Sequence, residues 1–283
     1  MKTIGFVDYY ISEWHANNYP NWMKTACEKL GEDFQVKYAW AEKDVSEVDG
    51  KTTAEWCKEK QVTQCASIEE LCEKADYIVI LAPSNPEKHL EYAKRVFPFG
   101  KPTFIDKTFA PDLETAKEIY RIADENGVKF FSTSALRFAV ETDGVKGECK
   151  AAFVTGPGKT VDEYIIHPVE TTVKCMGVGA KKVKMQKNCD QRIFTIDYEN
   201  GKRASIFYQE FGGAPHSATV TDKDGKSVFC KVEQPFFPVM VENMINFFKT
   251  GNLPFEREQT LEAMKIRDGI LKSMLNEETW IEL

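Results

Sequence analysis

The sequence has no apolar run approaching the ~18 residues that a membrane-spanning helix needs. It has no charged-then-apolar segment near its start of the kind that directs secretion. It also lacks an excess of basic residues, because 37 Lys and Arg stand against 44 Asp and Glu, which leaves a formal charge of −7. An acidic chain has no electrostatic footprint for nucleic acid or an anionic membrane, so we expect neither as a partner. These absences favour a cytoplasmic protein.

Cysteine pairs at metal-binding or redox spacing are also missing. The chain has 8 cysteines, but no two of them are spaced C-x-x-C. His15 and His89 have no metal-ligand spacing to another Cys, His or acid. We therefore expect reduced thiols and no metal site.

What the chain does contain is a globular composition, with 42% hydrophobic and 29% charged residues over 283 positions. Such values exclude disorder as the main state, and the length allows two domains of ordinary size. Apolar runs predict strands at residues 2–8, 34–41, 77–81, 102–105 and 129–132. Helix patterns lie between them at about residues 18–30, 53–60, 67–74, 86–97 and 112–126. This alternation predicts a doubly wound parallel sheet over residues 1–132.

The pattern changes in the second half. We expect a strand at 147–154, a helix at 161–175, strands and hairpin turns over 180–232, helices at 238–249 and 258–274, and a last strand at 280–283. Asn200-Gly201 is a strong hairpin signal. Residues 133–283 are therefore predicted to form an α+β domain with a mostly antiparallel open sheet. The boundary falls near 133–146, and a C-terminal helix could still pack back on the first domain.

The carboxyl ends of the parallel strands are where such a sheet binds ligands. A dinucleotide loop after the first strand needs G-x-G-x-x-G, yet residues 8–13 read DYYISE. An ordinary loop is therefore favoured on this segment alone. Glu42 after the second strand either holds an adenosine ribose or is simply solvated. Lys107, after the strand at 102–105, either donates to a substrate hydroxyl or is solvated.

Glu163, His167 and Glu170 lie at spacings of four and three, which puts them on one helix face. A carboxylate one turn from an imidazole fixes its tautomer, and histidine is a natural general base at neutral pH. The alternatives are that Glu163 closes a capping box with Thr160 and that His167 is a core residue. Pro168 removes a backbone donor, so it should kink this helix.

Five short motifs, in order, resemble the family of glucose–fructose oxidoreductase and inositol dehydrogenase (Gfo/Idh/MocA) over nearly the full length. Ala82-Pro83-Ser84-Asn85 with His89 is similar to the family's T-P-N segment with a following histidine, and residues 100–108 are similar to its G-K-x-V-x-x-E-K-P signature. Residues 123–128 are similar to its A-x-x-x-G-V helix end, and Arg137-Phe138 to its R-F pair. Residues 163–170 are similar to its D-x-x-x-H-x-x-D motif. In the last motif each Asp is replaced by Glu.

The resemblance implies a Rossmann-like first domain and hydride transfer between NAD or NADP and a hydroxyl-bearing carbon of a sugar or polyol. It implies that Lys107 lies near the nicotinamide and the substrate hydroxyl, that His167 takes the hydroxyl proton, and that Glu163 is the acidic partner of His167. The implied cofactor contacts are Tyr9, Tyr10, Ile11, Ala82, Pro83, Ser84, Asn85, His89 and Asp106, and the implied substrate contacts are Arg137 and Glu170.

The chain departs from the family at the glycine fingerprint, which aligns with Asp8, Tyr10 and Glu13. The large side chain of Tyr10 and the negative charges of Asp8 and Glu13 occupy the place where bare backbone should contact the phosphates. Either the loop takes a different path, or the cofactor binds weakly, or none binds. Asp106 and Thr108 replace the Glu and Pro of E-K-P. Besides an oxidoreductase, two readings therefore stay open: a non-catalytic ligand-binding relative, and a lyase or isomerase that transfers protons without net redox.

We expect a homodimer or homotetramer formed through the second-domain sheet. One open face of that sheet is predicted to be rich in Phe194, Ile196, Ile206, Phe207 and Tyr208, and a large apolar face is usually buried. The alternative is that the chain's own helices cover these residues.

Overall fold

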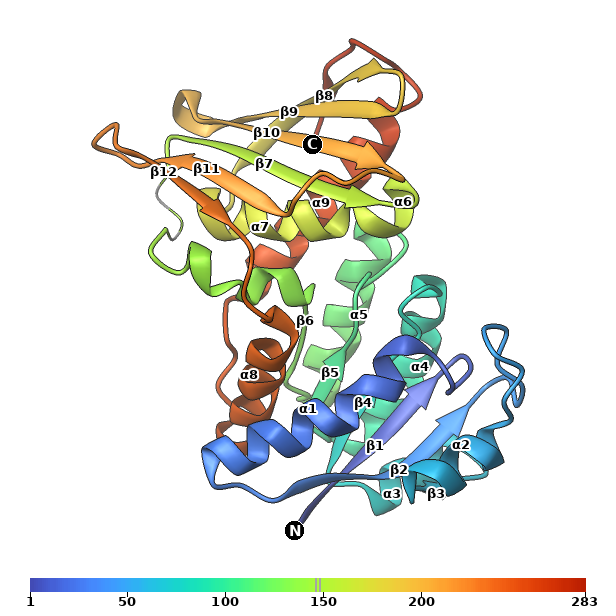
Figure 1. Cartoon of the computed structure of the whole chain (residues 1–283). Helices are drawn as coiled ribbons and strands as arrows, with labels where there is room; N and C mark the ends of the chain where they lie inside the picture. The colour runs from blue at the N-terminus through green and yellow to red at the C-terminus, as the bar shows by residue number, and fades with distance from the viewer. Residues whose placement is uncertain (146, 148) are drawn as a thin grey trace. The chain divides into compact units, whose positions relative to one another are not determined.

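The computed structural model of the chain describes residues 1–145, 147 and 149–283 (Figure 1). The chain divides into two compact units, one of Met1–Thr133 with Phe237–Pro254 and one of Ser134–Phe236 with Phe255–Leu283. We call them unit 1 and unit 2. They differ from the predicted division after residue 132 in one segment, because Phe237–Pro254 packs with the first half of the chain. The predicted boundary segment includes Lys146, which lies outside the described residues.

Unit 1 contains a parallel sheet of 6 strands in the order β3-β2-β1-β4-β5-β6. The strands are β1 (Lys2–Asp8), β2 (Phe34–Ala41), β3 (Thr63–Gln64), β4 (Tyr77–Ile80), β5 (Thr103–Ile105) and β6 (Phe130–Ser132). This confirms the predicted doubly wound sheet. The strand order reverses between β1 and β4, which is where ligands bind in such folds.

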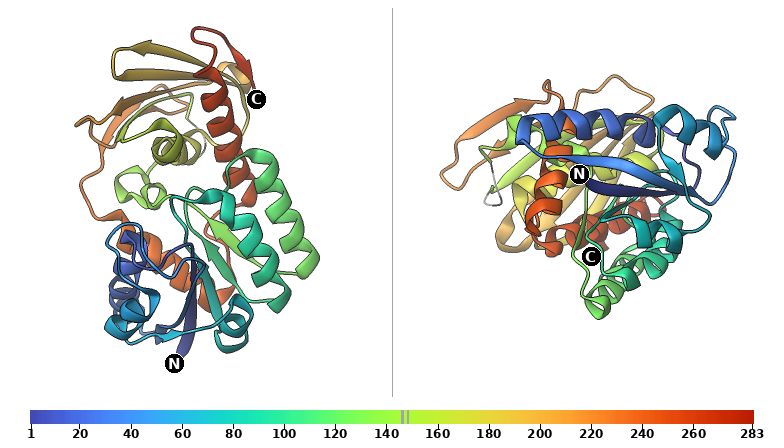
Figure 2. Two further views of the ribbon diagram at one scale, coloured as in Figure 1. Left: turned by 90° about the vertical axis from the view of Figure 1, so that its right-hand side faces the viewer. Right: turned by 90° about the horizontal axis from the view of Figure 1, so that it is seen from below.

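The helices of unit 1 cover both faces of this sheet (Figure 2). They are α1 (Trp14–Leu30), α2 (Thr53–Lys60), α3 (Ile68–Lys74), α4 (His89–Val96), α5 (Leu113–Asn126) and α8 (Phe236–Thr250). On one face, the ring of Phe131 in β6 lies 5.3 Å from that of Phe247 in α8. On the other face, Phe130 lies 4.6 Å from Tyr120 in α5. Adjacent residues of β6 thus point to opposite layers, as a strand requires.

Two helix predictions need correction. Helix α1 begins at Trp14 instead of residue 18, because the side chain of Glu13 caps it, and the helix continues through Pro20. The predicted helix 86–97 is a 3-10 turn (Pro86–Lys88), α4, and a second 3-10 turn (Phe97–Phe99).

Aromatic residues of α8 explain why this helix belongs to unit 1. Phe248 packs against Phe34 of β2 and Tyr77 of β4, with ring centroids 6.4 and 4.8 Å apart. Two ion pairs join α8 to the end of α1. Glu242 pairs with Lys29 of α1 at 2.8 Å, and Lys249 pairs with Glu32, just after α1, at 2.6 Å. Helix α8 therefore packs on the parallel sheet of unit 1.

Unit 2 contains a mixed sheet of 7 strands in the order β12-β11-β7-β10-β9-β8-β13. The strands are β7 (Ala151–Gly158), β8 (Ala180–Asn188), β9 (Gln191–Tyr198), β10 (Arg203–Glu210), β11 (Ser217–Thr221), β12 (Ser227–Lys231) and β13 (Ile281–Glu282). Strands β7 and β10 pair in parallel, and the other pairs are antiparallel. The fold class is as predicted. The strand expected from residue 147 begins at Ala151, and Glu148 lies outside the described residues.

The helices of unit 2 are α6 (Val161–Tyr164), α7 (Ile166–Met176) and α9 (Arg257–Ser273), with 3-10 turns at Ala135–Phe138, Val140–Thr142 and Glu199–Gly201. The predicted helix 161–175 breaks at Ile165. The interruption follows from Pro168, where a kink was expected, because this residue has no N–H to donate to the Tyr164 carbonyl. Helix α7 packs on β7 and β10, and α9 packs on β8.

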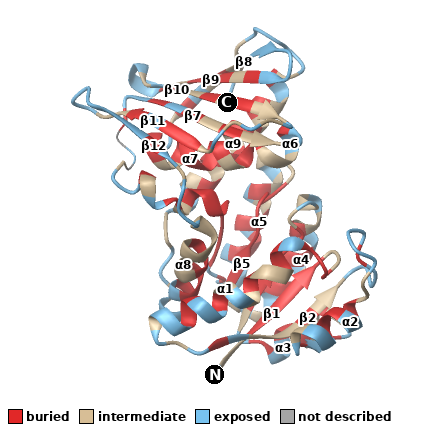
Figure 3. Cartoon of the chain, viewed as in Figure 1, coloured by how far each residue is buried: buried red, intermediate tan, exposed pale blue. Residues whose placement is uncertain are grey.

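These helices cover the sheet face that was predicted to be open (Figure 3). The side chains of Phe194, Ile196, Ile206 and Tyr208 are buried, and of the five predicted residues Phe207 alone, which alternates with them, lies on the outer face. The prediction of an apolar open face is therefore wrong for four residues. The strand alternation is correct, but it does not tell which face the helices take. Oligomer formation stays a prediction.

In the described part of the chain, no helix is long and apolar enough to cross a membrane. The cysteines are free thiols, all buried except Cys189. Within the same residues, no group of three or more His, Cys, Asp or Glu side chains is arranged to hold a metal ion.

Candidate functional site

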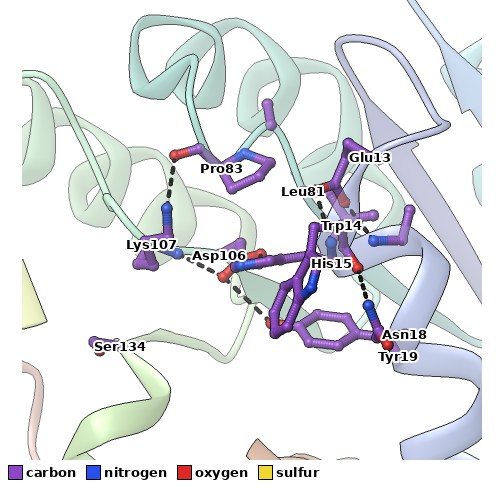
Figure 4. Close-up of polar contacts among 12 residues, drawn as sticks. Glu13, Trp14, His15, Asn18, Tyr19, Leu81, Pro83, Asp106, Lys107 and Ser134 are labelled. Atoms are coloured by element: carbon purple, nitrogen blue, oxygen red, sulfur yellow. Dashed lines mark hydrogen bonds and ion pairs between the residues drawn. The ribbon is translucent and has the colours of Figure 1, made fainter. Parts of the chain in front are cut away.

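The carboxyl ends of β1, β4 and β5 in unit 1 bring together several charged side chains (Figure 4). Asp8 ends β1, Ala82 and Pro83 follow β4, and Asp106 and Lys107 follow β5. Ala82 has a φ of 60°, a left-handed conformation that is unusual for a residue with a side chain. This edge of the sheet is where the sequence predicts the ligand to bind.

Asp106 is a buried carboxylate that accepts three hydrogen bonds from its own unit. Its Oδ1 accepts from the Lys107 backbone N–H at 2.8 Å and from the Tyr19 hydroxyl at 3.3 Å, and its Oδ2 is hydrogen-bonded to Nδ1 of His15. Burial raises the pKa of Asp106, but the charge and hydrogen bond of His15 outweigh it and leave the pKa below its usual value. An ionised Asp106 accepts from Nδ1 of His15, so Nδ1 is the donor of this contact.

The His15 ring lies among aromatic side chains of unit 1. Trp14, Tyr19 and Phe237 have ring centroids 5.2, 5.5 and 5.7 Å from it. Trp14, with 53% of its surface exposed, forms the outer side of this group. The sequence analysis considered His15 only as a metal ligand and missed this arrangement, which no local spacing signals.

Lys107 is almost buried, and its ammonium donates to the Pro83 carbonyl at 3.3 Å. The loop after β5 and the loop after β4 are thereby joined across the sheet edge. No carboxylate lies within ion-pair distance of this ammonium among the described residues. It keeps hydrogens for a further acceptor, which suits a group that binds a hydroxyl.

Asp8 is a second buried carboxylate, 1% exposed, at the point where the strand order reverses. Its Oδ1 accepts from the backbone N–H groups of Tyr9 and Ala82, at 2.7 and 2.9 Å. Its Oδ2 is buried and has no hydrogen-bond partner in the described part of the chain. Burial first, and then the nearby charge of Glu13, raise the pKa of Asp8 well above its usual value.

Glu13 places a third carboxylate at the start of α1. Its Oε2 accepts from the backbone N–H of His15 at 2.7 Å and its Oε1 from that of Ala16. Burial raises the pKa of Glu13, although His15 and the two backbone hydrogen bonds act in the opposite direction. The loop before it is fixed, because Ser12 donates to Asp49 at 2.8 Å and accepts at its carbonyl from Ser46 at 2.7 Å.

These contacts decide how a dinucleotide fits. In this fold the pyrophosphate binds to free N–H groups at the start of the first helix. Here two of those groups are held by Glu13, and Asp8 holds two more on the neighbouring loops. While Glu13 caps α1, the residues present do not fit a pyrophosphate at that position.

Other predicted cofactor contacts lie around the same edge. Ile11 is buried, Tyr9 and Tyr10 are half-buried, and the ammonium groups of Lys43 and Lys88 lie 4.7 and 5.4 Å from the ring centre of Tyr9. Ser84 and Asn85 lie in the loop after β4, where the amide of Asn85 donates to Glu87 at 3.1 Å.

Glu42, the candidate for a ribose contact, accepts from Lys88 at 2.6 Å and from the Tyr92 hydroxyl at 2.7 Å. Burial raises the pKa of Glu42, but these two hydrogen bonds outweigh it and lower the pKa. Both partners belong to unit 1, so the carboxylate is already bound to its own chain.

His89 is completely buried, and both of its ring nitrogens are hydrogen-bonded to backbone carbonyls. Nδ1 bonds to Phe109 at 2.9 Å and Nε2 to Leu81 at 2.5 Å. Burial lowers the pKa of His89 despite these two contacts. The side chain ties the end of β4 to the loop after β5, so it positions the site and has no surface for a ligand.

In unit 2, Ser134 is a polar partner of His167. Ser134 Oγ lies 2.7 Å from His167 Nδ1 and accepts from the backbone N–H of Leu136 at 3.2 Å. Glu163 donates its backbone N–H to Thr160 Oγ1 at 3.4 Å, as the cap of α6 requires. Nothing in the sequence singled out Ser134.

Arg137 and Glu170, the predicted substrate residues, form a buried ion pair at 2.9 Å. The guanidinium also donates to the side-chain oxygen of Gln259 and lies 4.1 Å from the ring centre of Phe255. Each of the two charges thus has a partner inside unit 2. This arrangement joins the segment after β6 to α7.

Comparisons with known proteins agree with this architecture. Residues 27–134 match the oxidoreductase family with an NAD-binding Rossmann fold (GFO_IDH_MocA), and this match does not include the loop at 8–13. An uncharacterised oxidoreductase of Escherichia coli (strain K12), YhhX, is 30% identical over 63 residues, which are 22% of this chain and 18% of that protein's length.

Two solved structures share the fold of the whole chain. GenD2 from gentamicin A biosynthesis, in complex with NAD, has a TM-score of 0.79 at 10% identity and covers 100% of this chain and 97% of its own. The UDP-N-acetylglucosamine 3-dehydrogenase GnnA from Acidithiobacillus ferrooxidans has a TM-score of 0.75 at 11% identity, with 96% and 97% covered.

Proposed function

We propose that the chain is an oxidoreductase of the GFO_IDH_MocA family, whose model residues 27–134 match, and that it oxidises or reduces a hydroxyl-bearing carbon of a small sugar- or polyol-like molecule. The observation that carries this proposal is Lys107, an almost buried ammonium at the carboxyl end of β5 whose recorded partner is the Pro83 carbonyl. The likeness in fold between this chain and a dehydrogenase of a nucleotide sugar supports a sugar-like substrate.

Two residues have a proposed role in the reaction. Lys107 donates a hydrogen bond to the substrate hydroxyl and stabilises negative charge that develops on its oxygen. His167 takes the hydroxyl proton. Ser134 Oγ has a second lone pair for Nδ1–H, and in that tautomer Nε2 carries the lone pair that accepts the proton. Ser134 is thus a positioning residue.

The test is a turnover assay with a panel of sugars and polyols and either nicotinamide dinucleotide, followed by the absorbance of the reduced nicotinamide. We expect Lys107→Ala to lower kcat/KM by at least about a hundredfold. Lys101→Ala is the matched control, because Lys101 precedes the same strand. Full activity in Lys107→Ala, or no turnover with any member of the panel, would contradict the proposal.

A second candidate function is proton transfer without net redox, and it is favoured by the filled pyrophosphate position. Asp8 and Glu13 hold the backbone donors that a dinucleotide needs. Exchange of substrate carbon-bound hydrogen with deuterated solvent, followed by NMR in the absence of any dinucleotide, distinguishes this candidate from the first.

We also propose that the protein is a homo-oligomer of the cytoplasm. Support for oligomers comes from Phe153 and Phe229 on the outer sheet side of unit 2, with 45% and 63% of their surface exposed. Free buried thiols support a reducing compartment. Light scattering of the purified chain tests the first statement, and a monomer at high concentration would contradict it.

A further inference from the structure

The first turn of α1 already binds a negatively charged group of the chain itself, the carboxylate of Glu13. Both carboxylate oxygens of Glu13 accept hydrogen bonds from the first turn of the helix, at the backbone N–H groups of His15 and Ala16. Glu13 is 7% exposed, so these bonds are shielded from water. A carboxylate at this place interacts with the helix dipole as a phosphate does, and it satisfies the same donors.

A second, independent observation points to the same place. Asp8 holds the N–H groups of Tyr9 and Ala82, which flank the reversal of strand order, and its other oxygen is buried without a partner in the described part of the chain. The charge of Glu13 acts directly on Asp8. Four backbone donors are therefore occupied by two carboxylates of the chain itself.

The loop cannot simply move aside. Ser12, which precedes Glu13, is almost fully buried and bonded to both Ser46 and Asp49 of the segment after β2. Any phosphate that reaches the helix start has to displace the Glu13 side chain itself. Until it does so, two like charges lie within a few ångströms in a buried site, which is unfavourable at low dielectric constant.

We propose that Glu13 is a built-in competitor of the cofactor pyrophosphate, and that it keeps the affinity of this chain for NADH and NADPH low. The inference rests on the proposed function, since it takes a nicotinamide dinucleotide to be the cofactor. It goes further by assigning cofactor affinity to one side chain. The charged groups that face Glu13 are Asp8, His15 and Asp106, and none of them is changed in the test.

The test is calorimetric titration of the full-length chain with NADH and with NADPH at moderate salt. Glu13→Gln removes the charge but keeps an oxygen that can cap α1, and Glu13→Gly removes both. We expect each variant to bind at least one dinucleotide at least about tenfold more tightly than the unchanged protein, and Glu13→Gly most tightly. Glu28→Gln removes an exposed charge from the same helix and is the matched control.

Two results would overturn the inference. One is micromolar binding by the unchanged protein that neither Glu13 variant improves. The other is the absence of binding up to millimolar dinucleotide in Glu13→Gly that still melts cooperatively, because the carboxylate is then not what excludes the pyrophosphate. Failure of the proposed function has a different signature: Glu13→Gly gains affinity, yet no sugar or polyol is turned over and Lys107→Ala changes nothing.

Discussion

Replacing Asp8 with Asn should stabilise the protein at neutral pH, which is unusual for a buried, hydrogen-bonded residue. Asn keeps an oxygen that can accept from Tyr9 and Ala82, so the contacts of Oδ1 survive. The change removes the buried negative charge of Asp8 and its repulsion with Glu13. A carboxyl whose pKa is raised on folding loses about 1.4 kcal/mol of stability per pH unit of that rise once it ionises, so we expect a gain of at least about 1 kcal/mol near pH 7.5.

The pH dependence of this gain follows from the raised pKa of Asp8. The folded state keeps the Asp8 proton at higher pH than the unfolded state does, so the unchanged protein loses stability as pH rises through the window above the ordinary carboxyl pKa. Each unit of that displacement contributes about 1.4 kcal/mol. Asn does not titrate, so the difference between the two proteins should be small near pH 4 and grow towards pH 8.

Urea denaturation of both proteins between pH 4 and pH 8 measures the effect. Asp76→Asn is the matched variant, for which we expect the opposite dependence of stability on pH. The Thr3 backbone N–H donates to Asp76 at 2.8 Å and lowers the pKa of that carboxyl, so its contribution is present at neutral pH and lost as pH falls. An Asp8→Asn protein that is less stable at pH 8, or a difference that does not vary with pH, would refute the reasoning.

Two further predictions concern unit 2. Ser134→Ala should lower turnover by about tenfold with less than about 1 kcal/mol of lost stability, and should change the tautomer of His167 seen by NMR; an unchanged tautomer would show that Ser134 does not position the ring. Arg137→Met and Glu170→Gln should each lower the free energy of unfolding by about 3–5 kcal/mol in denaturation experiments, because each leaves the buried charge of the other residue without its partner. The double variant Arg137→Met/Glu170→Met should recover much of this lost stability. Equal losses of stability in the single and double variants would contradict this reasoning.

The elements that the sequence predicts best are those whose cause is local. The run at residues 77–81 is apolar throughout because both faces of a central parallel strand are covered, and β4 lies there. Asn200 and Gly201 have φ angles of 61° and 74°, the left-handed conformation that favours these two residue types in the hairpin turn formed by residues 199–201. Tyr198 N–H donates to the Lys202 carbonyl at 2.9 Å and closes that turn.

The start of α1 was missed for a physical reason. Glutamate is not among the side chains that commonly cap helices, whereas Pro20 is of the type that often begins one. The cap forms here because Glu13 is held in a buried loop by the contacts of Ser12, which come from a different part of the chain. A preference read from neighbouring residues cannot include such contacts.

The candidate site was predicted as a set of strand ends, but not as a network. His15 and Asp106 are 91 residues apart in the sequence and meet because β1 and β5 flank β4. Similarly, Ser134 and His167 are 33 residues apart. The sequence can name residues at the ends of adjacent strands, while the choice of partner depends on side-chain directions that only packing decides.

The place of α8 in unit 1 also determines the order in which this protein can be made. The chain leaves unit 1 after Thr133 and returns at Phe237, so a ribosome has produced more than a hundred residues of unit 2 before the last helix of unit 1 emerges. Until then, the apolar faces of Phe34, Tyr77 and Phe131 have no cover from α8. Unit 1 therefore cannot finish folding as soon as its first 133 residues are made, as an uninterrupted N-terminal domain can, and the nascent chain depends on the later segment to close its first core.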